Sequence, residues 1–263
     1  MLREKSFLIF DMDGTIYLGE SPLPGALGFF ARLRDSGKRF IYFTNNASKD
    51  LSAYESKLER LGFPVFDGCL MSSAEVTARH ILTQYAGKTV YVLGTLSLAA
   101  TFAKAGINVT DGDADVVVTS FDTTLTYERL SHVCTLIRNG AVWLTTHPDV
   151  NCPTEHGFVP DSGAINAAIS ASTGKSLPKA FGKPSADALA VIEDTYGVKR
   201  ADMAVFGDRL YTDIAFGRDN GMFAVLMLTG EATRAEAMNL PQQKQPEAIY
   251  ENLAEAAQEI FAL

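Results

Sequence analysis

Short apolar runs recur along the chain and alternate with longer segments of mixed polarity. Runs of about four to eight residues that are rich in Val, Ile and Phe, and that end at Gly, Asp, Asn or Ser, are typical of buried strands. We predict strands in seven such runs, which are "SFLIF" (6–10), "RFIYFT" (39–44), "KTVYVLG" (88–94), "ADVVVTS" (114–120), "AVWLTT" (141–146), "MAVFGD" (203–208) and "FAVLML" (223–228).

The segments between these runs carry the start and stop signals of helices. A helix is predicted from about Pro24 to Ser36, where Gly37 stops it, because glycine commonly ends helices. A second helix is predicted over 50–62, with Gly62 as its C-cap.

A third helix is expected over 185–196, with Ser185 as its N-cap, and an amphipathic helix over the last segment, 250–263. The stretch "NLPQQKQPEAIYE" (239–251) instead predicts a loose connection. The repeated alternation of strand and helix predicts an α/β fold, a doubly wound parallel sheet with helices on both faces.

Composition and charge narrow the class of protein. The chain has 263 residues, of which 47% are hydrophobic and 21% charged, as in ordinary soluble globular proteins. A net charge of −8 would repel a polyanion, which argues against nucleic acid as a partner. Three cysteines without a C-x-x-C pair favour a reducing compartment. Because no apolar run suits a signal peptide or a membrane span, we expect a cytoplasmic protein with no membrane partner.

Polar residues with chemical potential follow three of the predicted strands. Asp11 and Asp13 come directly after the first strand. Thr44 ends the second strand, and Asp208 ends the sixth, with Asp213 five residues further on. Ligands of open parallel sheets bind beyond the carboxyl ends of the strands, so we expect these three ends to meet at one crevice.

The neighbouring carboxylates of Asp11 and Asp13 would repel each other unless something offsets their charge. A cation would do so, and Asp11, Asp13 and Asp208 together suit Mg²⁺, which prefers hard oxygen ligands. One carboxylate can also attack phosphorus to form an aspartyl-phosphate, while the second protonates the leaving oxygen and later deprotonates water. Gly14 would let the backbone approach the phosphoryl group closely. The pattern therefore predicts phosphoryl chemistry with Mg²⁺ as cofactor.

Phosphoryl oxygens also need hydrogen-bond donors and a balancing positive charge. Thr44 offers a hydroxyl group, and the backbone N–H groups that follow it, at Asn45 and Asn46, add further donors. Lys183 in "FGKPS" would supply the charge, and Pro184 favours an extended backbone at Lys183.

Four motifs occur in order, "DMDGT" (11–15), "FTNN" (43–46), "GKPS" (182–185) and "GDRLYTD" (207–213). Together they resemble the signature motifs of the haloacid dehalogenase superfamily of phosphatases. The resemblance implies that Asp11 is the nucleophile and a metal ligand. It also implies that Asp13 is the acid/base catalyst, with its carbonyl group on the metal.

The same resemblance assigns roles to the later motifs. Thr44 and Lys183 would hold the phosphate, and Asp208 would be a further metal ligand. Asp213 would be a nearby carboxylate that orients Lys183 or the water molecules of the metal.

The spacing of the motifs leaves room for one inserted domain. Asp11 and Thr44 are only 33 positions apart, whereas Asn46 and Lys183 are 137 positions apart. This resembles the NagD-like branch, which includes p-nitrophenyl, phosphoglycolate and pyridoxal phosphate phosphatases and carries an α/β cap between the second and third motifs. We therefore expect a core over 1–78 and 180–263 and a cap over 79–179.

Two features of the cap segment bear on this division. The strands over 88–94 and 141–146 end without a carboxylate cluster, which suggests that they belong to a different sheet. In "THPD" (146–149), His147 stands where the branch commonly has asparagine, and both His147 and Asp149 are candidate contacts for substrate specificity. The branch is often dimeric through its cap, which makes a homodimer a further expectation.

Two other functions fit parts of this pattern. A phosphotransferase would pass the phosphoryl group to an alcohol, and the motifs do not separate that reaction from hydrolysis. A non-catalytic metabolite-binding module could share the fold, but it would have no use for Asp13 as an acid/base. The substrate would be a small phosphomonoester, with sugar phosphates, nucleoside monophosphates, phosphoglycolate and pyridoxal phosphate all open, and p-nitrophenyl phosphate as an artificial substrate.

Overall fold

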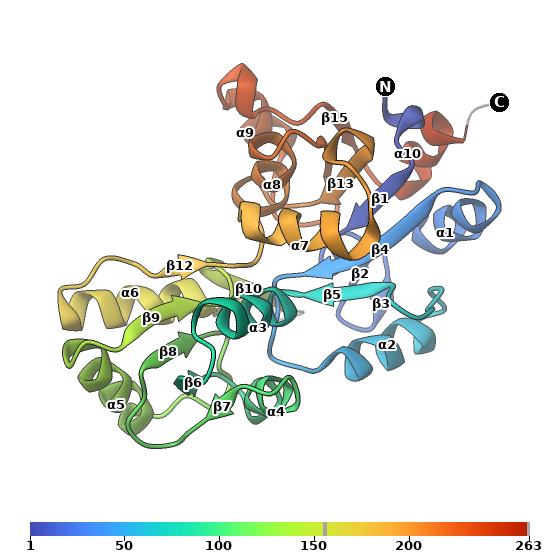
Figure 1. Ribbon diagram of the computed structural model, residues 1–263. Helices are drawn as coiled ribbons and strands as arrows, with labels where there is room; N and C mark the ends of the chain where they lie inside the picture. Colours follow the sequence, from blue (N-terminus) through green and yellow to red (C-terminus); the bar gives the residue numbers. More distant parts are fainter. Residues whose placement is uncertain (155–156, 262–263) are drawn as a thin grey trace.

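The chain folds into two lobes, each built on a parallel sheet, in the computed structural model, which describes residues 1–154 and 157–261 (Figure 1). The larger lobe, called the core, carries both termini, and the smaller lobe, called the cap, is formed by the middle of the chain, drawn in green and yellow. The predicted fold, a doubly wound parallel sheet with an inserted α/β unit, is confirmed.

The core sheet has six parallel strands in the described part of the chain. Their spatial order is β15 (Ala248–Tyr250), β14 (Phe223–Met227), β13 (Met203–Gly207), β1 (Phe7–Phe10), β4 (Arg39–Thr44) and β5 (Leu70–Ser72). The strand order reverses at β1, because β13 lies on one side of it and β4 on the other. The crevice at such a reversal is where open α/β sheets bind ligands.

Helices cover both faces of the core sheet, which is why its strands read as continuous apolar runs. Leu8 and Phe10 face one side and Phe7 and Ile9 the other, because side chains alternate along a strand. The first face is covered by α1 (Ala26–Asp35), α2 (Leu51–Arg60) and α10 (Leu253–Ile260). The second face is covered by α3 (Ser73–Gln84), α7 (Ala186–Tyr196) and α8 (Ala215–Asp219).

Shorter elements complete the core. An antiparallel hairpin of β2 (Tyr17–Leu18) and β3 (Ser21–Pro22) follows β1, and α9 (Arg234–Asn239) follows β14. Single helical turns lie at η1 (Leu2–Glu4), η2 (Arg200–Asp202), η3 (Leu210–Ile214) and η4 (Gln242–Lys244), of which η3 is a π-helical turn and the others are 3₁₀ turns.

The cap sheet has five parallel strands within the described residues. Their order is β12 (Lys179–Ala180), β9 (Val142–Thr145), β8 (Val116–Thr119), β6 (Thr89–Leu93) and β7 (Asn108–Val109). Two helices, α5 (Tyr127–Arg138) and α6 (Ser162–Thr173), cover one face, and α4 (Leu96–Lys104) covers the other. A hairpin of β10 (Asn151–Thr154) and β11 (Gly157–Pro160) follows β9. The strands over 88–94 and 141–146 thus lie in a second sheet, as predicted.

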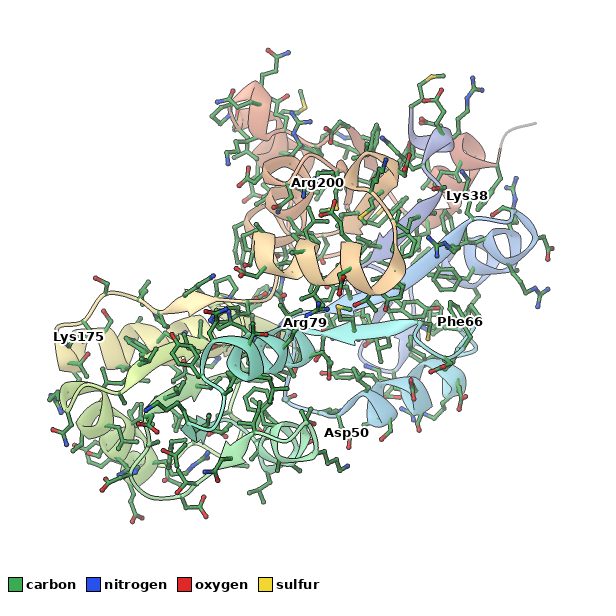
Figure 2. The ribbon with its side chains drawn as sticks, in the orientation of Figure 1. Lys38, Asp50, Phe66, Arg79, Lys175 and Arg200 are labelled. Carbon is green, nitrogen blue, oxygen red and sulfur yellow. The ribbon has the colours of Figure 1, made fainter. Side chains whose placement is uncertain are left out.

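Helix α3 joins the two lobes. Its residue Ile81 belongs to an apolar cluster that contains Ile41 of the core sheet as well as Val92 of the cap sheet. Arg79 of α3 pairs with Asp194 of α7 at 2.5 Å, which ties the same helix to the core (Figure 2). The proposed division of the chain after residues 78 and 179 falls inside α3 and β12, and it stays a prediction.

All seven predicted strands are present, and the predicted helices differ mainly at their ends. The helix expected from Pro24 runs from Ala26 to Asp35, and the C-cap of α2 is Leu61, with Gly62 next to it at a φ of +86°. Ser185 caps α7 as predicted, because its hydroxyl accepts a hydrogen bond from the N–H group of Asp187.

The C-terminal prediction is wrong in part. Tyr250 ends strand β15, and helix α10 begins only at Leu253, capped by Asn252, while residues 262–263 lie outside the described residues. The stretch over 239–251 is therefore not a loose connection. The short sequence "AIY" becomes a strand because it pairs with β14 at the sheet edge, and no pattern of its own signals that.

In the part of the chain that the structure describes, none of the helices combines the length and the apolarity that crossing a membrane requires.

Candidate active site

Three neighbouring strands of the core sheet end at one point. Asp11 follows β1 directly, and its N–H group donates a hydrogen bond to the carbonyl group of Phe206 in β13 at 2.8 Å. Thr44 is the last residue of β4, and Asp208 comes directly after β13. The parallel register pairs Phe10 with both flanking strands, so the three ends lie side by side. The structure therefore brings together the residues that the sequence placed at three separate strand ends.

Lys183 lies at the centre of this group, although its segment comes from far along the chain. Its ammonium group is 2.6 Å from Oδ1 of Asp11 and 2.7 Å from Oδ1 of Asp213. It also donates a hydrogen bond to the carbonyl group of Phe43 at 2.9 Å. Two carboxylates and one carbonyl group thus surround the ammonium group, and the side chain is 1% exposed.

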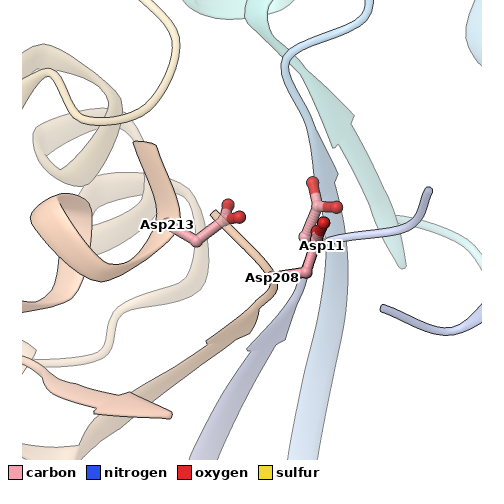
Figure 3. A group of neighbouring side chains, drawn as sticks. All are labelled: Asp11, Asp208 and Asp213. Atoms are coloured by element: carbon pink, nitrogen blue, oxygen red, sulfur yellow. The ribbon is translucent and has the colours of Figure 1, made fainter. Parts of the chain in front are cut away.

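Three carboxylates converge around one point, as Figure 3 shows. One oxygen each of Asp11, Asp208 and Asp213 lies within 4.8 Å of the others. Asp11 and Asp208 come from the strand ends, and Asp213 comes from the π-helical turn η3 that follows Asp208. Three hard oxygen donors this close together are a suitable set for a divalent cation such as Mg²⁺.

Two glycines leave the space that Asp208 occupies. A Cβ atom on Gly14 would lie 2.6 Å from Oδ2 of Asp208, and one on Gly230 would lie 2.0 Å from the same atom. Oδ2 also accepts a hydrogen bond from the N–H group of Glu231 at 2.8 Å, while Oδ1 accepts one from the hydroxyl of Thr15 at 3.3 Å. The position of this carboxylate is therefore set by backbone packing on two sides.

The electrostatics of these carboxylates favour a bound cation. Burial raises the pKa of Asp11 well above its usual range, and the nearby charges of Asp213 and Asp208 add to this, although Lys183 opposes it. Burial also raises the pKa of Asp208 to about 7, with Asp213 as the next cause. For Lys183, burial alone would lower the pKa, but the two carboxylates that it contacts outweigh burial and raise it. A bound cation would lower the pKa of Asp11 and Asp208, because it stabilises ionised carboxylates.

Asp13 lies outside the three-carboxylate group, and its carboxylate contacts Tyr17 and Lys57 instead. Its Oδ2 is 3.4 Å from the hydroxyl of Tyr17, and its Oδ1 is 3.9 Å from the ammonium group of Lys57. Burial raises the pKa of the Asp13 carboxyl, with Lys57 the largest opposing influence. The carboxylate of Asp13 is thus not among the groups that converge on a cation, and the predicted metal contact through its carbonyl group stays a prediction.

The segment after β4 fixes the backbone beside Lys183. Asn45 accepts a hydrogen bond from the N–H group of Lys183 at 2.8 Å and donates one to the carbonyl group of Lys183 at 2.9 Å. Thr44 is buried, and its oxygen accepts a hydrogen bond from the N–H group of Asn46 at 3.1 Å, so its hydroxyl proton is available to a ligand. The side chain of Asn46 accepts two hydrogen bonds from Ser48 and stabilises its own loop.

A cavity above these residues is closed by the cap. From the core, its walls include Asp11, Asp13, Thr44, Asn45, Asn46, Lys183, Arg209 and Asp213. From the cap, they include His147, Asp149, Cys152, Pro153 and Asp161. The cavity thus lies between the two lobes, and Asp11, Asp213 and Lys183 are part of its wall on the core side.

The two cap residues singled out in the sequence are both buried at this boundary. His147 is paired with Asp161 at 2.8 Å, through its Nε2 atom, and Nδ1 lies 2.7 Å from the hydroxyl of Thr146. Asp149 accepts a hydrogen bond from the side-chain amide of Asn45 at 2.7 Å and pairs with Arg209.

Sequence reasoning missed Arg209 and Glu231. Arg209 directly follows Asp208 in the motif "GDRLYTD", and its Nε atom lies 3.1 Å from Oε2 of Glu231. The only available signal was its place in that motif, because its two acidic partners come from distant parts of the chain. Glu231 carried no signal, since it lies in a loop after β14 that has no catalytic pattern.

Family models and known proteins match most of this chain. A family model described as haloacid dehalogenase-like hydrolase matches residues 8–108, and one described as HAD-hydrolase-like matches residues 180–256. An acid sugar phosphatase of Staphylococcus aureus is 34% identical over 261 residues, which is 99% of each chain.

Two solved structures are similar over almost the whole of this chain. A 4-nitrophenylphosphatase from Thermotoga maritima has a TM-score of 0.93 and 41% identity, and the match covers 98% of both chains. A glycerol phosphate phosphatase from Mycobacterium tuberculosis, in complex with magnesium, has a TM-score of 0.88 and 30% identity, over 96% of this chain and 76% of that one.

Proposed function

The chain belongs to the haloacid dehalogenase-like hydrolases, in the NagD-like branch, and is a phosphatase; on that premise we propose that it hydrolyses small phosphomonoesters with Mg²⁺ through an aspartyl-phosphate on Asp11. The observation that carries the proposal is the contact of Lys183 with Asp11 and Asp213, three residues that line one cavity and lie next to Asp208. This arrangement provides a nucleophile, a positive charge and a cation site within one small volume.

The donor set fits Mg²⁺. Asp11 and Asp208 offer carboxylate oxygens within 4.8 Å of each other, and the resemblance to the family adds the carbonyl group of Asp13. Asp213 belongs to the same group, but it is buried, and its Oδ1 lies 2.7 Å from the ammonium group of Lys183. We therefore assign to Asp213 the positioning of Lys183. When bound, Mg²⁺ would neutralise negative charge on the phosphoryl group and on Asp11.

The first step is attack by a carboxylate oxygen of Asp11 on phosphorus. The bond between phosphorus and the ester oxygen breaks, and the leaving oxygen takes a proton from Asp13. Lys183 and the hydroxyl of Thr44 contact the phosphoryl oxygens and stabilise their charge in the transition state. In the second step a water molecule attacks phosphorus, Asp13 accepts its proton, and the bond from phosphorus to Asp11 breaks.

Asp13 is suited to the acid role because burial raises its pKa. A carboxyl group whose pKa lies nearer to the working pH keeps its proton long enough to donate it and can still act as a base afterwards. The separation of Asp13 from the three-carboxylate group fits an acid/base role that is distinct from the nucleophile role of Asp11. Asp11 lies with the charged groups, whereas Asp13 faces Tyr17 and Lys57.

The relatives support a small phosphomonoester as the substrate. They are described as an acid sugar phosphatase, a 4-nitrophenylphosphatase and a glycerol phosphate phosphatase, and the chain covers nearly all of the first two. The crevice between core and cap would hold the phosphoryl group at its floor and the leaving group against the cap. The homodimer through the cap and the cytoplasmic location stay predictions.

Phosphate release measured over a panel of substrates tests the proposal. Purified protein is assayed with p-nitrophenyl phosphate, sugar phosphates, glycerol phosphate, a nucleoside monophosphate, phosphoglycolate and pyridoxal phosphate, with Mg²⁺ or with EDTA. We expect Mg²⁺-dependent release of inorganic phosphate, and a phosphorylated Asp11 in peptides from acid-quenched reactions. An added alcohol that captured most of the phosphoryl group would indicate a phosphotransferase instead, and no release from any substrate would indicate a binding module.

A further inference from the structure

Asp149 is a cap residue whose side chain contacts the core beside the proposed catalytic residues. It follows β9 in the cap, and it is 1% exposed. Its carbonyl group accepts a hydrogen bond from the N–H group of Gly163, in the first turn of α6, at 2.7 Å. A Cβ atom on Gly163 would lie only 2.8 Å from that carbonyl oxygen, so backbone is packed directly on backbone here. Asp149 is thus held rigidly on the cap side.

Both carboxylate oxygens of Asp149 point to the core. Oδ2 accepts a hydrogen bond from Nδ2 of Asn45 at 2.7 Å, and Oδ1 pairs with Nη1 of Arg209. A bare carboxylate facing this cavity would repel a negatively charged phosphomonoester, but here the guanidinium group of Arg209 neutralises it. The side chain of Asp149 therefore binds residues of the core rather than the substrate.

The contact with Asn45 leads directly to Lys183. The amide of Asn45 makes two hydrogen bonds to the backbone of Lys183, at 2.8 and 2.9 Å, and its remaining contact is Asp149. The fit is tight, because a Cβ atom on Gly182 would lie 2.4 Å from Oδ1 of Asn45. A change in the orientation of this amide would move the backbone that carries the ammonium group.

The contact with Arg209 leads to the same ammonium group from the other side. The N–H group of Arg209 donates a hydrogen bond to Oδ2 of Asp213 at 3.1 Å, and Oδ1 of Asp213 is 2.7 Å from Lys183. Arg209 also follows the metal-site residue Asp208, and its Nε atom lies 3.1 Å from Glu231, whose N–H group binds Asp208. The side chain of Arg209 is only 12% exposed, so its buried charge needs the nearby carboxylates of Asp149 and Glu231.

We infer that Asp149 is a positioning residue, which couples the seating of the cap on the core to the placement of Lys183 through Asn45 and Arg209. The inference rests on the proposed function, because it assigns Asp149 to positioning within that site rather than to recognition of the leaving group. Loss of its carboxylate would lower the turnover of every substrate by a similar factor. A residue that recognises the leaving group would instead change the ratio between substrates.

Steady-state kinetics of Asp149→Ala and Asp149→Asn test this. We expect kcat to fall at least tenfold for p-nitrophenyl phosphate and for glycerol phosphate alike, with KM changing less than threefold. The ratio of kcat/KM between the two substrates should stay within threefold of the wild-type ratio. A ratio that changes tenfold, or a kcat that stays within twofold of wild type, would overturn the inference.

A double-mutant cycle with Arg209→Ala adds a second test. Because both substitutions remove the same contact, the double variant should lose little more kcat than the more damaged single variant. Multiplied losses would show that the two residues act independently. Should Asp149→Ala fail to fold, Arg209→Ala alone tests the contact from the core side, with the same expected fall in kcat and the same unchanged substrate ratio.

Asp122→Asn is the matched control. Asp122 is also a buried cap carboxylate that pairs with an arginine, Arg129 at 2.6 Å, but both partners lie in the cap, away from the catalytic cavity. We expect its kcat to stay within twofold of wild type. A loss as large as that of Asp149→Asn would mean that any damage to the cap lowers turnover.

A measurement without turnover separates this inference from the proposed function. The backbone N–H group of Lys183 should exchange with solvent at least tenfold faster in Asp149→Ala than in wild type or Asp122→Asn, because Asn45 loses its partner. If wild type releases no phosphate, the proposed function fails, while this comparison still decides the positioning role. Unchanged exchange at Lys183 would overturn that role.

Discussion

The ammonium group of Lys183 lies 2.6 Å from Oδ1 of Asp11, although 172 positions separate the two residues in the chain. The pair is almost fully enclosed, since the side chain of Lys183 is 1% exposed and that of Asp11 is 15% exposed. Burying an unpaired charge destabilises the folded protein, so each of these two residues offsets the cost of burying the other. The same contact aligns the proposed nucleophile with the charge that would bind its substrate.

Replacing Lys183 with methionine should damage activity and stability together. The methionine side chain has a similar shape, but Asp11 and Asp213 lose the positive charge of the lysine ammonium group. Loss of one charge-stabilising group at a transition state lowers kcat by about 10²–10³-fold, and breaking a buried ion pair costs about 3–5 kcal/mol of unfolding free energy. Turnover of p-nitrophenyl phosphate and urea unfolding in EDTA measure the two effects.

A nearby lysine provides the control for that experiment. Lys179 pairs with Asp187 at 2.9 Å, but its side chain is 53% exposed. Lys179→Met should keep kcat within twofold and change the unfolding free energy by less than about 1 kcal/mol. A Lys183→Met enzyme that kept a third of wild-type turnover would contradict the role given to Lys183.

Replacing Asp13 with asparagine should slow hydrolysis of the aspartyl-phosphate for every substrate. It should slow the first step only for substrates whose leaving group needs a proton. p-Nitrophenolate leaves readily without a proton, whereas the alkoxide of an alkyl phosphate needs one. Stopped-flow assays should therefore show one burst of p-nitrophenol per active site, followed by turnover slowed about 10²–10⁴-fold. Glycerol phosphate should give no burst of glycerol. Equal slowing of both substrates with no burst would argue against Asp13 as the general acid.

Replacing Gly230 with alanine should weaken Mg²⁺ binding. A Cβ atom there would lie 2.0 Å from Oδ2 of Asp208, so the carboxylate or its loop must move. We expect the Mg²⁺ concentration for half-maximal activity to rise at least tenfold.

Gly28→Ala is the control, because Gly28 lies in α1 with nothing within 4 Å of the added atom. That substitution should stabilise the protein by roughly 0.5–1 kcal/mol and leave the Mg²⁺ requirement unchanged. An unaltered Mg²⁺ requirement in Gly230→Ala would remove Asp208 from the metal site.

The pair of His147 and Asp161 should make the stability of the protein depend on pH. Burial alone would lower the pKa of His147, but the carboxylate of Asp161 outweighs burial and raises it above the usual value. The folded state therefore holds the proton more tightly than the unfolded state does. The resulting stability is fully present below the pKa of an unfolded histidine, about 6.5, and is lost as the pH rises through the folded value.

Urea unfolding of wild type and His147→Gln at several pH values measures this. Wild type should be more stable than the variant by roughly 1–3 kcal/mol near pH 6, and the difference should shrink at high pH. A difference that stayed constant, or grew as the pH rose, would show that His147 is not charged in its pair with Asp161.

Much of this protein was open to prediction from its sequence. The buried strands appear as apolar runs because helices cover both faces of each sheet, and helix ends are marked by local signals such as Ser185 and Gly62. The motifs at the ends of β1, β4 and β13 pointed to one crevice, because neighbouring parallel strands end at the same edge. Where a strand depended on its neighbour alone, as at β15, the sequence contained no such signal.

The sequence by itself thus determined the two α/β units and the order of the motifs, and it predicts the chemistry of Asp11, Asp13 and Lys183. Only the tertiary structure decided that Asp149 of the cap binds Asn45 and Arg209 of the core, and that Asp213 is buried against Lys183. The physical reason is that these contacts form when two separate sheets pack against each other. Periodicity, capping and turn signals act over a few residues along the chain and carry no information about which distant surfaces will meet.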